Sequence, residues 1–361
     1  MGDDLKGMLK RHEAFWRGEG ERALRQVTAF QPLEEQGNLP LADGSRAKEG
    51  QALTPDMIDP RRFYGDAEPM RRRGLPDVAS GGRSAGDGEG SPIRGDFMTG
   101  SAPPGLCWTE AIIGCPVRMV TGGAWAEPFF EEKGDPADLQ PDARWLGKLD
   151  EFVDFLVGRA DGRYPVGQPL FRGPVDMMAA ALGHERMCVA LMEDPAWTDA
   201  FLGRCAEMFI EVARRRLAHT PAFEGGYLSA YGIWAPGTVV RTQLDNATLL
   251  SPEVYRERAL PHDRRVIEAF DFPLIHVHSC CLHIVDDLLG VEALRAIQVS
   301  IDYPGGPLAS DVLPVFGDIL KVKPLIVTGP VTRGELEALE GLEPSGRLCL
   351  QAQVIEGRAG G

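Results

Sequence analysis

The sequence predicts an α/β protein, a closed (β/α)8 barrel, on three observations. From about Asp142 onward, short apolar runs alternate with amphipathic helical segments, as in successive βα units. The last four apolar runs begin at 273, 296, 324 and 347, a regular spacing that suits a barrel. The chain has 361 residues, whereas a barrel typically needs about 250. We therefore expect a single barrel domain over 1–361, with a doubly wound open sheet as the alternative.

The expected strands are short and rich in aliphatic residues. Six of them lie in the regular part of the chain, at 168–172, 226–234, 273–279, 296–302, 324–329 and 347–354. Two further candidates lie earlier, at 23–30 and 115–123. Together they make the eight strands that a closed barrel requires.

Three of the intervening helices carry start signals. The helix at 174–192 begins with Pro174, and proline is common in a first helical turn. The helix at 195–218 follows an Asp-Pro pair, and the helix at 251–270 has Ser251 as its N-cap. These signals fix the amino-terminal ends of the three helices.

The first part of the chain is less regular. Residues 1–71 contain one amphipathic helix and a turn-rich tail, which we interpret as an N-terminal extension of the barrel. Residues 72–95 contain seven glycines and no hydrophobic periodicity, and they predict a long Gly-rich loop. This loop is either a flexible insertion without function or an ordered lid over an active site.

Composition excludes several classes of protein. Lys and Arg number 38 against 53 Asp and Glu, and the formal charge of -15 excludes a protein that coats nucleic acid. No apolar run approaches the ~18 residues of a membrane span, and the charged start does not resemble a signal peptide. Seven cysteines, an odd number in a long chain, do not indicate a disulfide framework. We expect a cytoplasmic enzyme with a small-molecule substrate, and a homodimer is a reasonable expectation for a barrel.

The stretch FPLIHVHSCCLH at 272–283 is the most informative. Because side chains alternate along a strand, His276, His278 and Cys280 point to one face. The Cα atoms of His278 and Cys280 are then about 6.8 Å apart, close enough for both side chains to bind one zinc ion. They lie at the carboxyl end of an expected barrel strand, where catalytic groups of barrels collect.

A zinc site needs a third protein ligand. Cys349 is the first candidate, because it lies in the expected last strand, which would be near this one in a barrel. His276 and His283 are the alternatives, the latter about one turn into the following helix. The competing interpretation is that these groups are hydrogen-bonded polar residues on an inward face and bind no metal.

Further polar residues follow the expected strands. Tyr231, Trp234 and Arg241 could line the cavity as substrate-binding residues, and Asp245 is placed as a general base or substrate anchor. For the two aromatic residues the alternative is core packing.

Other candidates lie at the ends of further segments. Asp302 is a second catalytic candidate that could orient a ligating histidine, or else cap a helix. Trp125 and Glu127 reach the mouth of the cavity as further substrate-binding residues, whereas Glu110 more simply begins a helix.

Several of these stretches resemble the uroporphyrinogen decarboxylase superfamily. The strings that carry the resemblance are GPVDMMAAALGHERMCVALMEDPAW, QLDNATLLSPEVYRERALPHDRRVIEAF, HVHSC with DDLLGVEALRAIQVSID, CWTEAIIGCPVRMVTGGAWAEPFFE and RHEAFWRGEG. The resemblance covers most of the chain and is weakest at 32–106. It implies a (β/α)8 barrel of one of two kinds, a cofactor-free porphyrinogen decarboxylase or a zinc-dependent methyltransferase that works with a corrinoid.

Motifs favour the methyltransferase branch. The decarboxylases carry an RQAGRY-like stretch near the N-terminus, which is not found here. The methyltransferases carry H-x-C and a later cysteine, and His278, Cys280 and Cys349 are similar to that layout. The usual glycine after H-x-C is replaced by Cys281. No D-x-H-x-x-G corrinoid-binding motif is present, so the resemblance implies that a partner protein supplies the corrinoid.

Three functions follow as hypotheses. The first is a zinc-dependent methyltransferase or demethylase component that moves a methyl group between a small substrate and a corrinoid protein. The second is a metal-free decarboxylase, a lyase in which Asp245 or Asp302 moves the proton and Arg241 anchors the substrate carboxylate. The third is a barrel that binds a ligand or a corrinoid partner without turnover.

Overall fold

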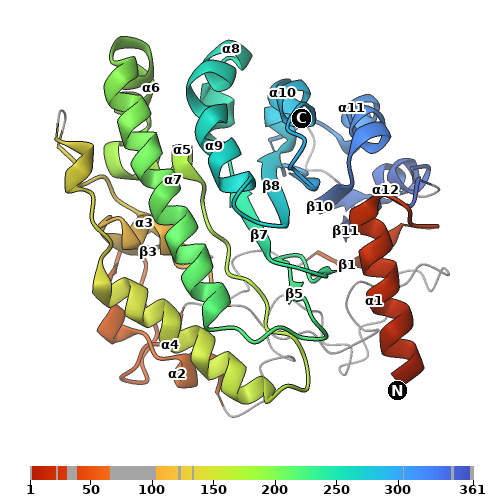
Figure 1. Ribbon diagram of the computed structural model, residues 1–361, viewed down its shortest axis with the longest axis horizontal. Helices are drawn as coiled ribbons and strands as arrows, with labels where there is room; N and C mark the ends of the chain where they lie inside the picture. Colours follow the sequence, from red (N-terminus) through yellow and green to blue (C-terminus); the bar gives the residue numbers. More distant parts are fainter. Residues whose placement is uncertain are drawn as a thin grey trace.

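The computed structural model describes residues 2–21, 23–30, 39–65, 103–120, 123–131, 134–303, 305–342 and 345–357. It is a mixed α/β fold with a central parallel sheet of six strands and helices packed around it (Figure 1). The sheet is formed by β1 (Leu24–Ala29), β7 (Val239–Gln243), β8 (Phe272–His278), β9 (Ala296–Ser300), β10 (Leu325–Thr332) and β11 (Leu348–Ile355).

The helices are of very different lengths. They are α1 (Gly2–Arg17), α2 (Pro60–Tyr64), α3 (Trp108–Ile112), α4 (Ala143–Ala160), α5 (Pro174–Leu182), α6 (His184–Glu193), α7 (Pro195–Ala218), α8 (Pro252–Val254), α9 (Leu260–Ile267), α10 (Val285–Leu289), α11 (Ala309–Val322) and α12 (Arg333–Glu340). Among the described residues, no helix combines the length and apolar character needed to cross a membrane.

The strand order shows how the sheet is wound. Strands β7 to β11 lie side by side in the order of the chain, and β1 is added next to β11. All these pairs are parallel, and Leu24 on the first strand is in register with Cys349 on the last. Segments from the two ends of the chain therefore form neighbouring strands.

The two faces of the sheet differ in chemistry. One face carries Ile275, Val277 and their equivalents, which pack against the helices in the large apolar core. On the other face the side chains change from apolar to polar along each strand. The changes run from Val239 to Arg241, Leu274 to His276, Ala296 to Gln298, Ile326 to Thr328 and Cys349 to Gln351. The polar half lies toward the carboxyl ends of the strands.

Helix α1 packs against the apolar half of this inner face. Phe15 and Trp16 join Leu274 and Cys349 in one buried cluster. The indole Nε1 of Trp16 donates to the backbone oxygen of Trp234 at 2.8 Å. The amino-terminal helix thus covers the end of the sheet opposite to its polar half.

The strand expected at 115–123 does not belong to the central sheet. Its counterpart β3 (Val117–Val120) pairs antiparallel with β2 (Ala52–Leu53) and β4 (Gly123–Ala126) in a separate sheet. Buried and more exposed residues alternate along β3, which is typical of a strand with only one face in the core. The expectation of a barrel strand here was wrong for that reason.

The expected strand at 168–172 forms no ladder in the structure. The segment lies beside β7. There the side chain of Gln168 donates to the backbone oxygen of Val239, and Pro169 has no N–H to donate. The contact becomes a main-chain one only at Gly173, whose N–H donates to the backbone oxygen of Gln243 at 3.0 Å.

The expected strand at 226–234 is a hairpin. Its strands β5 (Tyr227–Leu228) and β6 (Trp234–Ala235) pair antiparallel, and Gly232 in the turn has a φ of 73°. The sheet strand is the following β7, which the pattern missed because its buried residues include Arg241 and Thr242.

The other expected strands are confirmed. The helix expected at 195–218 is also confirmed as α7, whereas the other two expected helices are interrupted. The helix expected at 174–192 is divided into α5 and α6 at Gly183, which has a φ of 88°. The one expected at 251–270 contains a π-helical turn at Tyr255–Ala259. Ser251 caps it as expected, accepting from the N–H of Val254 at 3.1 Å. The predicted Gly-rich loop at 72–95 lies outside the described residues.

Candidate functional site

Three side chains that could bind a metal converge at the carboxyl ends of β7 and β8. His276 and His278 come from β8, where alternation places both on the inner face. Asp245 follows β7 at the start of a 3-10 helix, Asp245–Leu249. The ligand atoms of all three lie within 4.8 Å of one another.

The Oδ1 atom of Asp245 lies 3.3 Å from Nε2 of His276 and 3.3 Å from Nε2 of His278. Oδ1 is buried, and among the described residues it has no hydrogen-bond partner. A separation of 3.3 Å exceeds a normal N–H···O bond. It equals the spacing of about 3.3 Å between two ligands of a tetrahedral zinc ion with bonds near 2.05 Å.

Each imidazole is held by its other nitrogen. Nδ1 of His276 contacts the side-chain oxygen of Gln298, and Nδ1 of His278 lies 2.5 Å from Oδ1 of Asp302. A proton on Nδ1 satisfies each acceptor, and in the neutral imidazole it leaves the Nε2 lone pair on the side of Asp245, free for a metal ion. Carboxylate–histidine contacts of this kind are characteristic of metal centres.

Asp302 is itself held in place. Its Oδ2 accepts from Oγ of Ser279 at 2.7 Å and from the backbone N–H of Cys280 at 3.1 Å. The backbone N–H of Asp302 donates in turn to Ser279 Oγ at 3.0 Å. The residue expected to orient a histidine therefore contacts His278 directly and is braced by its neighbours.

The loop that carries Asp245 is fixed by Asp176 in the first turn of α5. Asp176 accepts from the backbone N–H of Asp245 at 3.0 Å, and from the backbone N–H and Nδ2 of Asn246 at 3.0 and 2.7 Å. The Gln243 side chain donates to Oδ2 of Asp245, so Oδ1 is left for another partner.

The carboxylates and imidazoles shift one another's acidity. Burial opposes the charged form of His278, but Asp245 and Asp302 outweigh it and raise the pKa of this imidazole to about 10. Burial, together with Arg241, lowers the pKa of His276 to about 4. The pKa of Asp245 is lowered, because the two imidazoles outweigh its own burial. Asp245 and Asp302 thus stabilise positive charge at His278, and a metal cation that binds there would take the place of its Nε2 proton.

Arg241 and Tyr231 lie beneath the histidines. The guanidinium of Arg241 donates from Nε to the Tyr231 hydroxyl at 2.8 Å and from Nη1 to the side-chain oxygen of Gln243 at 2.5 Å. The hydroxyl also lies 3.4 Å from Nδ1 of His276 and contacts Gln298. Arg241 is 3% exposed, so it acts inside this network rather than on its surface.

The cysteines expected as zinc ligands are not part of the cluster. Cys280 is exposed, and its Sγ lies 4.0 Å from Sγ of Cys281. Burial, helped by Asp302, raises the pKa of the Cys280 thiol. Cys349 is fully buried among apolar side chains of the inner face. The structure does not bring these two thiols together with His278.

The register explains the position of Cys349. The residue of β11 in register with His278, through Ser300 and Thr328, is Gln351. Cys349 stands two residues nearer the amino end of its strand, in the apolar half. The alternative ligand His283 also points elsewhere, since its Nε2 lies 2.9 Å from the backbone oxygen of Leu250.

Of the other expected substrate-binding residues, two lie at the surface and one is buried in the core. Trp125 is 46% exposed, and Glu127 forms an ion pair of 2.6 Å with Arg118. Trp234 is buried against Leu9 and Leu228, which agrees with the alternative interpretation that it packs in the core. Glu110, expected only to begin a helix, does lie in the first turn of α3.

Sequence reasoning missed Asp176, Gln243 and Gln298, which are buried polar residues around the cluster. The signal that could have found Gln243 and Gln298 is their position in short aliphatic strands, at the level where the neighbouring strand carries histidine. Asp176 lies in the first turn of α5, where a carboxylate is common for reasons unrelated to a site.

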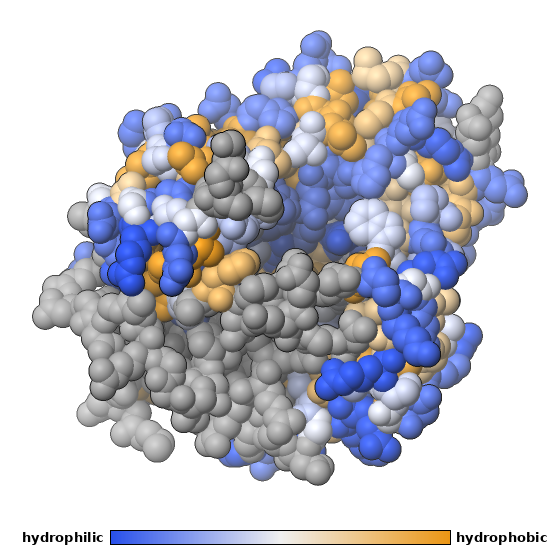
Figure 2. All heavy atoms as spheres, turned by 180° about the vertical axis from the view of Figure 1, so that it is seen from behind, coloured by the Kyte–Doolittle hydropathy of each residue, from blue (hydrophilic) through white to orange (hydrophobic). Residues whose placement is uncertain are grey.

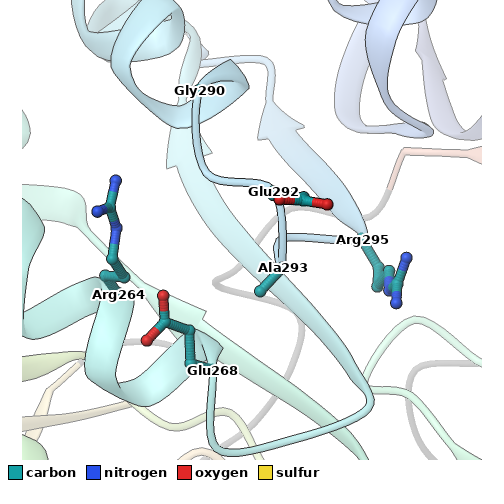
Figure 3. Close-up of a pocket in the computed structure, with 6 residues that line it drawn as sticks. All are labelled: Arg264, Glu268, Gly290, Glu292, Ala293 and Arg295. Carbon is teal, nitrogen blue, oxygen red and sulfur yellow. The ribbon is translucent and has the colours of Figure 1, made fainter.

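A surface pocket of about 510 Å³ lies elsewhere (Figure 3). It is found at the amino ends of β8 and β9, opposite to the polar half of the inner face, and is lined by Arg264, Glu268, Gly290, Glu292, Ala293 and Arg295. Sites in parallel α/β folds lie at the carboxyl ends of strands, so we do not assign the function to this pocket. From the side opposite to Figure 1, the molecule is hollowed near its centre, and much of the hollow is hydrophilic (Figure 2).

Comparison with known proteins identifies solved structures that share the fold of this protein. No family model matches the chain. A search of curated proteins finds no match. Eighteen chains of solved structures match. One is a methyltransferase from Methanosarcina mazei, with 14% sequence identity and a TM-score of 0.58 over 96% of this chain and 93% of that one. The protein thus shares its fold with a methyltransferase over nearly the whole of both chains.

Proposed function

We propose that the protein is a metal-dependent methyltransferase of the uroporphyrinogen decarboxylase superfamily, with zinc held by Asp245, His276 and His278. The observation that carries the proposal is the convergence of three possible ligands, in which the buried Oδ1 of Asp245 lies 3.3 Å from Nε2 of both His276 and His278. The shared fold with a methyltransferase supports the reaction class.

The barrel is part of the same proposal. Strands β7 to β11 follow one another in order, and β1 pairs with β11, as closure of a cylinder requires. The contacts of Gln168 and Gly173 with β7 support a further position in the barrel wall, beside β7, for the segment at 168–172. The cluster would then lie at the carboxyl mouth of a (β/α)8 barrel.

The donor set fits zinc, which takes imidazole nitrogen and carboxylate oxygen and keeps an open position in catalytic sites. A bound zinc ion supplies Lewis acidity, lowering the pKa of a coordinated thiol or water, or polarising a substrate oxygen. The chain's own residues fix the geometry. Asp302 and Gln298 set the imidazole tautomers, and Asp176 holds the Asp245 loop.

The methyl group would pass between a small substrate and a corrinoid carried by a partner protein. The exposed Cys280 beside the cluster is not needed as a ligand in this arrangement. The metal-free lyase is less well supported, because Arg241, its carboxylate anchor, already bonds Tyr231 and Gln243 and is buried.

Metal analysis tests the proposal. We expect about one zinc per chain in the purified protein, lost in Asp245→Ala and His276→Ala. Cys349→Ala and Cys280→Ala are matched controls that should keep it. Absence of metal after zinc is supplied would contradict the proposal and favour the lyase. Loss of zinc only in the cysteine variants would restore the ligand set expected from the sequence.

The reaction is tested with the zinc-loaded protein. Cob(I)alamin and candidate methyl donors are mixed with it, and formation of methylcobalamin is followed by its absorption spectrum. We expect turnover in the wild type and none in His276→Ala.

A further inference from the structure

Arg172 lies near the proposed metal site, close enough to interact electrostatically with Asp176 and Asp245. It precedes Gly173, whose N–H donates to the backbone oxygen of Gln243 at 3.0 Å, two residues before Asp245. A Cβ on Gly173 would lie 2.4 Å from that oxygen, so only glycine allows this close approach. The backbone contact therefore ties the position of Arg172 to the loop that carries Asp245.

The Arg172 side chain is held on two sides. Its Nη1 lies 3.0 Å from Oε1 of Glu110, a carboxylate that is fully buried. Its guanidinium carbon lies 5.9 Å above the ring of Trp125. The backbone N–H of Arg172 donates to Oγ1 of Thr109 at 3.1 Å. These contacts hold the guanidinium in place before any ligand arrives.

Part of this guanidinium remains available. The Arg172 side chain is 30% exposed, and among the described residues its Nε and Nη2 have no hydrogen-bond partner. The indole beneath it is 46% exposed and has His184 at its side, with a ring distance of 6.2 Å. A charged fork and an exposed aromatic surface thus lie next to each other.

We infer that Arg172 and Trp125 form the subsite for a carboxylate group of the substrate. A guanidinium fork matches the two oxygens of a carboxylate, and the indole offers apolar surface to the body of the same molecule. Without this guanidinium an anion would be disfavoured here, because Asp176 and Asp245 are near enough to interact with Arg172 electrostatically. The inference rests on the proposed function and specifies the substrate class: a small organic carboxylate with a transferable methyl group.

Paired probes that differ only in charge test the subsite. We would titrate the protein with 4-methoxybenzoate and with 4-methoxybenzamide and measure both affinities by calorimetry. The wild type is expected to prefer the carboxylate at least tenfold. Equal binding of the two probes, or no binding of the carboxylate, would overturn the inference.

The variants are chosen so that the buried Glu110 is never left as an unpaired charge. Arg172→Lys keeps the ion pair but lacks the fork, and is expected to reduce the preference severalfold. The double variant Arg172→Gln with Glu110→Gln makes the pair neutral. It should abolish the preference for the carboxylate probe. Arg265→Gln removes an exposed arginine that pairs with Glu207 at 3.1 Å, and serves as the matched control. A preference that survives in the double variant would overturn the inference.

Zinc content is measured on the same samples. Zinc binding together with an Arg172-dependent carboxylate preference supports both proposals. The preference without zinc supports the subsite and contradicts the metal-dependent function. Zinc without the preference contradicts the subsite alone, so the two failures are distinguishable.

Discussion

Oδ1 of Asp302 lies 2.5 Å from Nδ1 of His278, and this contact directs Nε2 of the imidazole toward Asp245. The orientation of a proposed ligand thus depends on a carboxylate that is not itself a ligand. Second carboxylates of this kind raise the basicity of the imidazole and fix its tautomer.

Replacing Asp302 by asparagine should weaken zinc binding by about 10- to 100-fold. The amide keeps the size of the side chain but removes the charge that favours Nδ1–H on His278. Affinity is measured by competition with a chromogenic chelator. Asp318→Asn, on the exposed side of α11, is the control and should bind zinc like the wild type. Equal zinc affinity in the two variants would remove Asp302 from the site.

Gly173→Ala should destabilise the protein by about 1–3 kcal/mol. The added Cβ would lie 2.4 Å from the backbone oxygen of Gln243 and 2.6 Å from Oγ1 of Thr242, so α5 must move away from β7. The control is Gly147→Ala, at an exposed position in α4 with no atom within 4 Å of the new Cβ. It should stabilise by about 0.5–1 kcal/mol. Urea unfolding midpoints measure both, and a shift of the same sign in both would contradict the packing argument.

His12 should make the protein labile to acid. It is buried and accepts from the N–H of Trp234 at 3.0 Å, and burial, with Arg11 nearby, lowers its pKa to about 3. Because the unfolded state binds the proton more readily, the contribution of His12 to the free energy of unfolding is fully present above pH 6.5. It is lost as the pH falls, by about 1.4 kcal/mol per unit down to about 3.

His12→Gln keeps an acceptor for the N–H of Trp234 and removes the titration. The free energy of unfolding of this variant, measured from pH 7 to 4, should lack the wild-type loss. A parallel decline in both proteins would show that His12 is not responsible.

Asp263 should act in the opposite direction. Burial, together with Asp176, raises the pKa of this carboxyl to about 8, against the bond that the Tyr255 hydroxyl donates at 3.2 Å. The folded state therefore holds the proton, and the stability present below about pH 4 is lost as the pH rises toward 8.

Asp263→Asn stays neutral at every pH. Relative to the wild type it should gain stability by about 1.4 kcal/mol per unit between pH 4 and 8. Urea unfolding at pH 5, 7 and 9 measures the difference. A difference that does not change with pH would show that Asp263 does not bind a proton on folding.

Much of the candidate site could be predicted from local pattern. Alternation in one strand placed His276 and His278 on one face, which needs only the geometry of a strand. Asp245 was expected in the cavity as a general base or substrate anchor, but the strand that brings it to the histidines is β7, which the pattern missed.

The remaining features depend on relations between distant segments. Cys349 was expected near His278, but the offset between strands is set by the packing of the helices that connect them, and it placed Gln351 at that level. Trp234 and Tyr231 lie three residues apart, and a hairpin turn sends one to α1 and the other to His276. No periodicity in the sequence records such a turn.

The pairing of β1 with β11 affects how the chain is made. Residues 24–29 leave the ribosome early, but their partner at 348–355 is synthesised only after more than three hundred further residues. Until then β1 and β10 both present open edges, and such edges recruit other strands. A chain that stops before Leu348 is therefore expected to aggregate, which light scattering would detect. The fold depends on complete synthesis, because its two most distant strands form a single seam.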